Sequence, residues 1–127
     1  MQPVIVFPDT AAAVIAHLNA VLAANFYGAV PTPRPDTFGT VQRLGGPRRS
    51  RFVDEAQLGV ECWAPTAGAA HDLAQLARAH INSLPGSTVA GARFYRVTEA
   101  AGPADLPDPL SGQPRFVFTV LVAARAS

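Results

Sequence analysis

Residues 56–64 alternate between apolar and polar side chains with a period of two. That period is typical of a strand with one buried face. Pro65 ends the alternation, and Thr66 stands where a helix N-cap offers its hydroxyl to an unpaired backbone N–H. The apolar side of the predicted strand consists of Ala56, Leu58, Val60, Cys62 and Ala64.

After Thr66, apolar residues recur at three- and four-residue steps, which predicts an amphipathic helix ended by Pro85 and Gly86. Its apolar face is rich in alanine, so the helix can lie close against a sheet. This strand–turn–helix unit is the best-defined part of the chain, and it contains no recognisable active site. The apolar face consists of Ala69, Leu73, Leu76, Ala77, Ile81 and Leu84.

The first half of the chain predicts a second helix and a hairpin. Asp9 or Thr10 is placed to cap a helix that runs to about Ala24. Residues 27–36 contain three prolines and predict an extended connection. Residues 37–44 predict a strand, and the turn-rich residues 45–50 connect it to the strand that follows, which gives a hairpin with a basic end.

The second half predicts a strand at 92–100, a loop rich in proline and glycine at 101–114, and a strand at 115–124. The last strand is apolar on both faces, which is typical of a central strand or of one covered by another subunit. The order of elements predicts an α+β fold. We expect residues 1–127 to form a single domain with a mostly antiparallel sheet of four to five strands and two helices on one face.

Composition narrows the classes of function. Charged residues make up 15% of the chain and hydrophobic residues 49%. Soluble domains carry roughly 25% charged residues, so we infer that part of the surface is buried against partners or other copies. The net charge of +1 argues against a dedicated nucleic-acid binder. No apolar run approaches the roughly 20 residues of a membrane span.

Candidate catalytic and metal-binding groups are few, and we expect no catalytic residue, cofactor or metal. Cys62 is the only cysteine and lies on the apolar side of its strand, where cysteine acts as a small buried hydrophobe. His71 and His80 fall on nearly opposite faces of one helix, and His17 belongs to the other helix. A Cys–His nucleophile pair and a histidine metal site are therefore the weaker interpretations.

Two polar segments remain as candidate sites. Glu99, Asp105 and Asp108 suggest a calcium loop, but the EF-hand spacing is absent. The prolines of residues 102–114 instead indicate a stiff docking loop, whose candidate contact residues are Leu106, Pro107, Asp108 and Leu110. The basic hairpin end, formed by Arg48, Arg49 and Arg51, fits phosphates or an acidic protein surface, although a solvated hairpin tip is the simpler interpretation.

Several runs of the sequence resemble tail terminator proteins of long, non-contractile-tailed (siphovirus) phages of actinobacteria. The resemblance covers most of the chain from about residue 28 onward, and its motifs are structural and carry no catalytic signature. The runs are residues 30–36 (VPTPRPD), 43–46 (RLGG), 58–64 (LGVECWA), 70–80 (AHDLAQLARAH) and 102–119 (GPADLPDPLSGQPRFVFT).

The resemblance implies a structural virion protein that is made in the host cytoplasm and placed at the head-proximal end of the tail. It implies a homohexameric ring that binds the tail tube protein, ends tube polymerisation and joins the head–tail connector protein, with DNA passing through its lumen. Arg48, Arg49 and Arg51 would then face the DNA channel or an acidic partner.

Two other classes of function stay open. One is another head–tail connector, adaptor or minor tail protein. The other is a small cytoplasmic ligand-binding domain or enzyme, which a deep pocket containing His80 or Cys62 would favour.

Overall fold

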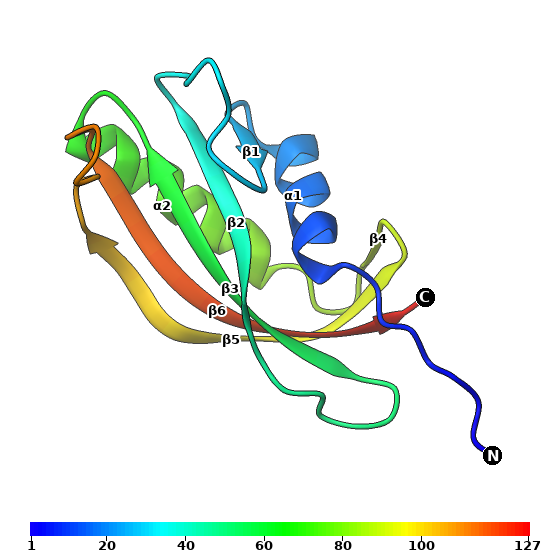
Figure 1. The fold of residues 1–127 in the computed structure, drawn as a ribbon. Helices are drawn as coiled ribbons and strands as arrows, with labels where there is room; N and C mark the ends of the chain where they lie inside the picture. Colours follow the sequence, from blue (N-terminus) through cyan, green and yellow to red (C-terminus); the bar gives the residue numbers. More distant parts are fainter.

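Two helices cover one face of a curled six-stranded sheet in the computed structural model, which describes all residues 1–127 (Figure 1). The strands lie in the order β1-β2-β3-β6-β5-β4. The predicted α+β class and the placement of both helices on one face are confirmed. The elements are α1 (Thr10–Val21), β1 (Asn25–Tyr27), β2 (Phe38–Gly45), β3 (Asp54–Trp63), α2 (Ala67–Asn82), β4 (Thr88–Val89), β5 (Ala92–Asp105) and β6 (Arg115–Ala126).

The sheet differs from the predicted one in size and in strand direction. It has six strands rather than four to five, and it is mixed because β1 pairs parallel to β2 while the other neighbours pair antiparallel. β1 and β4 contain three and two residues. Strands this short show no periodicity in the sequence, so hydrophobic patterning does not reveal them.

Both helices begin at the predicted capping residues. The side chain of Asp9 accepts a hydrogen bond from the backbone N–H of Ala12 at 3.0 Å, and Thr66 Oγ1 accepts one from Ala69 at 3.1 Å. Each bond satisfies one of the backbone donors that a helix N-terminus leaves unpaired. α1 ends at Val21, three residues before the predicted end.

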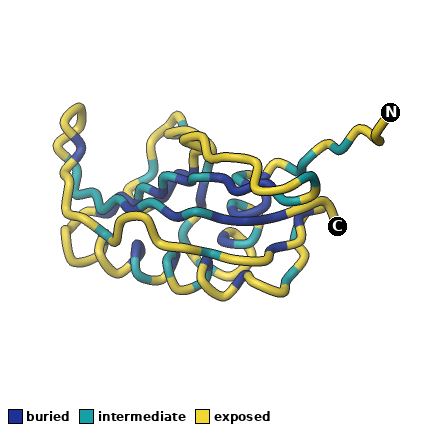
Figure 2. Tube along the Cα trace, turned by 90° about the horizontal axis from the view of Figure 1, so that it is seen from below, coloured by how far each residue is buried: buried dark blue, intermediate teal, exposed yellow.

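The hydrophobic core lies between the helices and the sheet (Figure 2). The predicted apolar sides of β3 and α2 both contribute to it, but Ala69 and Leu76 of α2 are exposed. Gly39 on β2 is required for close packing, because a Cβ atom there would lie 2.1 Å from the ring of Phe26 on β1. The largest fully buried core residues include Leu18, Phe26, Leu58, Ile81, Leu84 and Phe94.

β6 is a central strand, as its two apolar faces predicted. It pairs with β3 on one side and with β5 on the other. Phe118, Val120 and Val122 point into the core, whereas Val117 and Leu121 lie half-buried on the sheet face away from the helices. No helix covers that second face, and the β5–β6 loop covers only its end at Trp63.

β5 continues to Asp105, so the predicted end of this strand at Ala100 is wrong. The long partner β6 extends the pairing as far as Phe116, and three register shifts accommodate the irregular residues, including Pro103. The connecting loop is therefore confined to residues 106–114.

The two outer edges of the sheet are blocked in different ways. At β1, the side-chain amide of Asn19 on α1 accepts a hydrogen bond from the backbone N–H of Phe26 at 2.6 Å and donates one to its carbonyl at 3.1 Å. At the other edge, β4 pairs with only two residues of β5, and the register shifts and Pro103 interrupt the rest. Such devices oppose the addition of a further strand.

Candidate interaction surfaces

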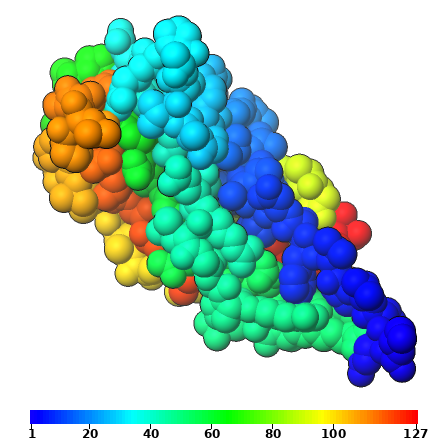
Figure 3. Space-filling model, in the orientation of Figure 1, coloured from blue at the N-terminus to red at the C-terminus, as the bar shows by residue number.

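The molecule is elongated, and its two ends carry different elements (Figure 3). With 12 residues, β6 is about 40 Å long at roughly 3.3 Å per residue. One end, the arm end, consists of the N-terminal segment 1–8 and the β2–β3 connection 46–53. The opposite end, the loop end, consists of the β5–β6 loop 106–114 and the β1–β2 connection 28–37.

Asp108 fixes the conformation of the β5–β6 loop. Its carboxylate accepts hydrogen bonds from Trp63 Nε1 at 3.0 Å, from Arg34 Nη2 at 2.6 Å and from the backbone N–H of Leu110 at 2.9 Å. The Leu110 bond, followed by those of Trp63 and Arg34, holds the pKa of Asp108 well below its usual range despite the opposing effect of burial. The loop is therefore an ordered element with a buried ionised anchor.

An aromatic stack lies under this loop on the sheet face away from the helices. The rings of Phe38 and Trp63 are stacked with centroids 4.5 Å apart, and the guanidinium carbon of Arg34 lies 5.4 Å and 5.5 Å from the two centroids. Arg115 also approaches the Trp63 ring, at 6.0 Å, and pairs with Glu61 at 3.3 Å. The sequence reasoning missed this cluster, although a tryptophan on the polar side of a predicted strand was a usable signal.

The predicted contact residues of the loop have different roles in the folded chain. Asp108 is buried and structural, whereas Leu106 and Leu110 are 51% and 96% exposed. Pro107 is exposed as well. The loop thus presents two leucine side chains to solvent on a backbone that its own hydrogen bonds fix.

Two of the three predicted arginines at the arm end bind backbone groups. Arg48 donates to the carbonyls of Ser50 at 3.0 Å and Arg51 at 2.8 Å, and its guanidinium lies 5.1 Å from the ring centroid of Phe7. Arg51 donates to the carbonyl of Pro3 at 3.0 Å. These contacts attach the N-terminal segment to the β2–β3 connection, and neither guanidinium contacts a carboxylate.

Arg49 instead pairs with a buried carboxylate. It lies 2.6 Å from Glu55, which is 3% exposed, and Arg96 on β5 lies 2.9 Å from the same carboxylate. The hydrogen bond from Arg96 is the main cause that lowers the pKa of Glu55, Arg49 adds to it, and burial opposes both. Arg49 therefore has a structural partner that the sequence did not reveal.

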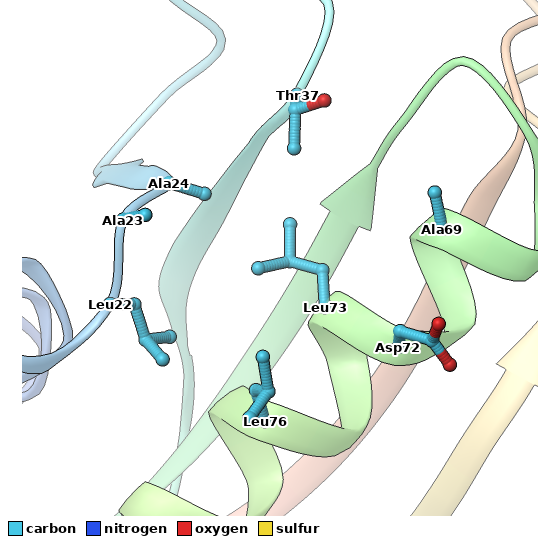
Figure 4. A pocket seen from close by; sticks show the side chains of 8 residues that line it. All are labelled: Leu22, Ala23, Ala24, Thr37, Ala69, Asp72, Leu73 and Leu76. Atoms are coloured by element: carbon cyan, nitrogen blue, oxygen red, sulfur yellow. The ribbon is translucent and has the colours of Figure 1, made fainter.

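An apolar cavity of about 340 Å³ opens between the segment that follows α1 and the N-terminal half of α2 (Figure 4). The side chains of Leu22, Leu73 and Leu76 point toward it, and Asp72 lies at its rim. Neither His80 nor Cys62 lines it. Its lining is completed by Ala23, Ala24, Thr37 and Ala69.

The candidate nucleophile and metal ligands are not assembled into a site. Cys62 is buried, and desolvation raises the pKa of its thiol to about 12, which disfavours the reactive thiolate. His17 and His80, on different helices, lie with ring centroids 6.2 Å apart, a neighbourhood the sequence did not reveal. No group of three or more potential metal ligands is present.

The carboxylates of the suggested calcium loop are also separated. Glu99 pairs with Arg78 on α2, and Asp108 is occupied by its own donors. Asp105 forms no ion pair. These three side chains therefore do not converge on one point.

The comparisons with known proteins identify no family. The chain matches no protein-family model, and no curated protein matches it significantly. Neither helix has the length and apolar character to cross a membrane.

Proposed function

We propose that this chain is a ring-forming tail terminator. Copies of it, six in number, form a ring on the last ring of a phage tail tube at its head-proximal end. The ring ends tube polymerisation and provides the surface that joins the head-side connector, and DNA passes through its lumen. The proposal rests on the resemblance of the sequence runs and on the shape of the subunit.

The observation that carries the proposal is the difference between the two ends of the subunit. A tube grows through one repeated head-to-tail interface and continues until something caps it. A ring that caps the tube needs two different surfaces on each subunit, through which neighbouring copies join. The arm end, held by Arg48 and Arg51, and the loop end, fixed by Asp108, supply two such ordered and dissimilar surfaces.

The sheet face away from the helices also supports an assembled state. Val117 and Leu121 lie half-buried there without a covering element. Partly exposed apolar surface of this kind is typical of proteins that associate. Another head–tail connector or adaptor of the same particle is the second candidate, because it would use similar surfaces.

The direct test adds the purified protein to growing tail tubes and measures their length by electron microscopy. Tubes should stop at the length they have reached, and a phage that lacks the protein should make overlong tails that fail to join filled heads. Tails of normal length in that phage would contradict termination and favour the adaptor role.

A matched pair of variants tests the docking loop. Leu106 and Leu76 are both 51% exposed, but Leu76 lies on α2, outside the loop. We expect Leu106→Ser combined with Leu110→Ser to abolish tube capping while the circular dichroism spectrum is unchanged. Leu76→Ser should cap tubes normally. Equal capping by both would show that the loop does not dock.

A further inference from the structure

The arginines that lack a carboxylate partner all lie at one end of the molecule. Of the ten arginines, six form ion pairs, and Arg48, Arg51, Arg93 and Arg125 do not. Arg48 and Arg51 belong to the β2–β3 connection. Arg93 and Arg125 lie directly opposite each other on β5 and β6, at the same end of the sheet.

The opposed pair is unfavourable in the isolated chain. Like charges directly across a strand pair repel each other, and no carboxylate neutralises Arg93 or Arg125. A partner that brings carboxylates to this end would remove that repulsion. The arm end therefore has the charge pattern of a binding surface for an acidic partner.

The carboxylates without an arginine partner are concentrated at the opposite end. Asp36 and Asp105 are exposed, form no ion pair and flank the β5–β6 loop. Asp72, near the start of α2, contacts only His71. The one such carboxylate at the arm end is Asp9, which caps α1. The loop end thus carries more of the free negative charge than the arm end does.

Exposed apolar side chains accompany the free charges at both ends. The arm end presents Val4 at 88%, Val6 at 78% and Phe52 at 49% exposure. The loop end presents Leu106 and Leu110. Each end therefore combines apolar contact groups with unpaired charges, and the charges of the two ends are opposite.

From this complementarity we infer that copies of the chain associate head to tail, with the arm end of one copy receiving the loop end of the next. The carboxylates of Asp36 and Asp105 then approach Arg93 and Arg125, and Leu110 packs against the apolar arm. The inference rests on the proposed function, because a ring forms only if copies of the chain bind one another. A contact between two different surfaces closes into a ring or continues as a filament, depending on its rotation.

A second copy fits the arm end better than DNA does. Phosphates would neutralise the free arginines, but they would leave Val4, Val6 and Phe52 without an apolar partner. DNA would also be repelled by the loop end. A copy of the chain matches both the charge and the apolar groups at each end.

The test uses sedimentation of the full chain and of two charge-reversal variants. Wild type should associate at about 50 mM sodium chloride, and its dissociation constant should rise at least about tenfold at about 500 mM, because salt screens exposed charges. Arg93→Glu/Arg125→Glu has two acidic ends, and Asp36→Arg/Asp105→Arg has two basic ends. Each should be monomeric alone, whereas an equal mixture should assemble again because both contacts become complementary.

Ala20→Arg provides the control for added charge, because Ala20 is exposed on α1, outside both ends and outside the sheet face away from the helices, and this variant should leave assembly unchanged. A wild type that stays monomeric at every concentration, or reversed variants that assemble alone, would overturn the inference. Binding of a fluorescent DNA duplex that is lost in Arg93→Glu/Arg125→Glu, without any self-association of wild type, would also overturn it and identify DNA as the partner.

The result of this sedimentation test can be distinguished from the result of the tube-length test of the proposed function. Head-to-tail filaments that do not stop tube growth would support the inference and contradict termination. Tube capping by a protein whose self-association is unchanged in both charge-reversal variants would support termination and contradict the head-to-tail contact.

Discussion

Trp63 and Asp108 lie 45 positions apart in the chain, and the indole N–H of Trp63 donates to the carboxylate of Asp108 at 3.0 Å. This bond connects the end of a central strand to the middle of the β5–β6 loop. Because both side chains are buried, the loop and the sheet are ordered together.

Replacing Asp108 with asparagine should destabilise this connection. The charged acceptor of three hydrogen bonds is lost, so we expect the free energy of unfolding to fall by about 2 kcal/mol. Trp63 is the only tryptophan, so its fluorescence reports directly on the loop. Asp105→Asn is the control, because Asp105 is exposed and unpaired. Equal stability of the two variants would contradict the structural role of Asp108.

Removing both partners of Glu55 should be more costly than removing any exposed arginine. Arg49→Ala/Arg96→Ala leaves a 3% exposed carboxylate without a cation. Because Arg49 and Arg96 are themselves 51% and 61% exposed, water reaches the carboxylate once they are removed, so we expect a cost of about 1 to 3 kcal/mol. Thermal denaturation should show a large loss of stability for this variant and little change for Arg48→Ala. Adding Glu55→Gln to the double variant should restore part of the loss.

Stability should fall as the solution becomes acidic. The folded-state pKa values of Glu55 and Asp108 are both lowered. Their contribution is therefore fully present above the unfolded values of about 4 and is lost as the pH falls through the folded values. Urea denaturation from pH 7 to pH 3 should show this decrease. Asp108→Asn and Glu55→Gln should each make the free energy of unfolding depend less steeply on pH. An unchanged pH dependence in both variants would be inconsistent with these interactions.

Cys62 should be unreactive in the folded protein. Its thiol is buried and its pKa is raised to about 12, so little thiolate exists at neutral pH. In the native protein, a thiol reagent should label Cys62 no faster than the chain unfolds. In urea, where the chain is unfolded, the reagent should label one thiol per chain. Rapid labelling of the native chain would show that this part of the core opens.

Asn19→Ala should loosen the β1 edge. Both hydrogen bonds to the Phe26 backbone are lost, and we expect a cost of about 1 kcal/mol. Amide exchange of Phe26 should accelerate, whereas exchange in β3 should not change. Asn25→Ala is the control, because its side chain forms no hydrogen bond in the structure.

Local patterns predicted the parts of the fold that local rules govern. The period of two in β3, the helical repeat of α2 and the caps at Asp9 and Thr66 are each contained within a few residues. β1 was not predicted, because its three residues are held by Asn19 and by β2 and carry no repeat of their own. β5 was predicted too short, because the pairing with β6 tolerates Pro103 at a register shift.

The candidate sites were predicted as segments but not as contacts. Nothing in the adjacent Arg48 and Arg49 distinguishes them, yet one binds backbone carbonyls and the other a buried Glu55. The role of Arg49 depends on Glu55 of β3, whose carboxylate it shares with Arg96 of β5 in the folded chain. The same is true of Asp108, whose partners Arg34 and Trp63 are distant in sequence.

The blocked edges of the sheet affect how copies of this chain can come together and separate. The amide of Asn19 occupies the backbone groups of Phe26, and the irregular β5 opposes a continuous ladder into a neighbouring molecule. Contacts between copies then depend on side chains, so they can break without any chain unfolding. A copy that attaches in a wrong position can leave and be replaced, which makes error correction during assembly possible.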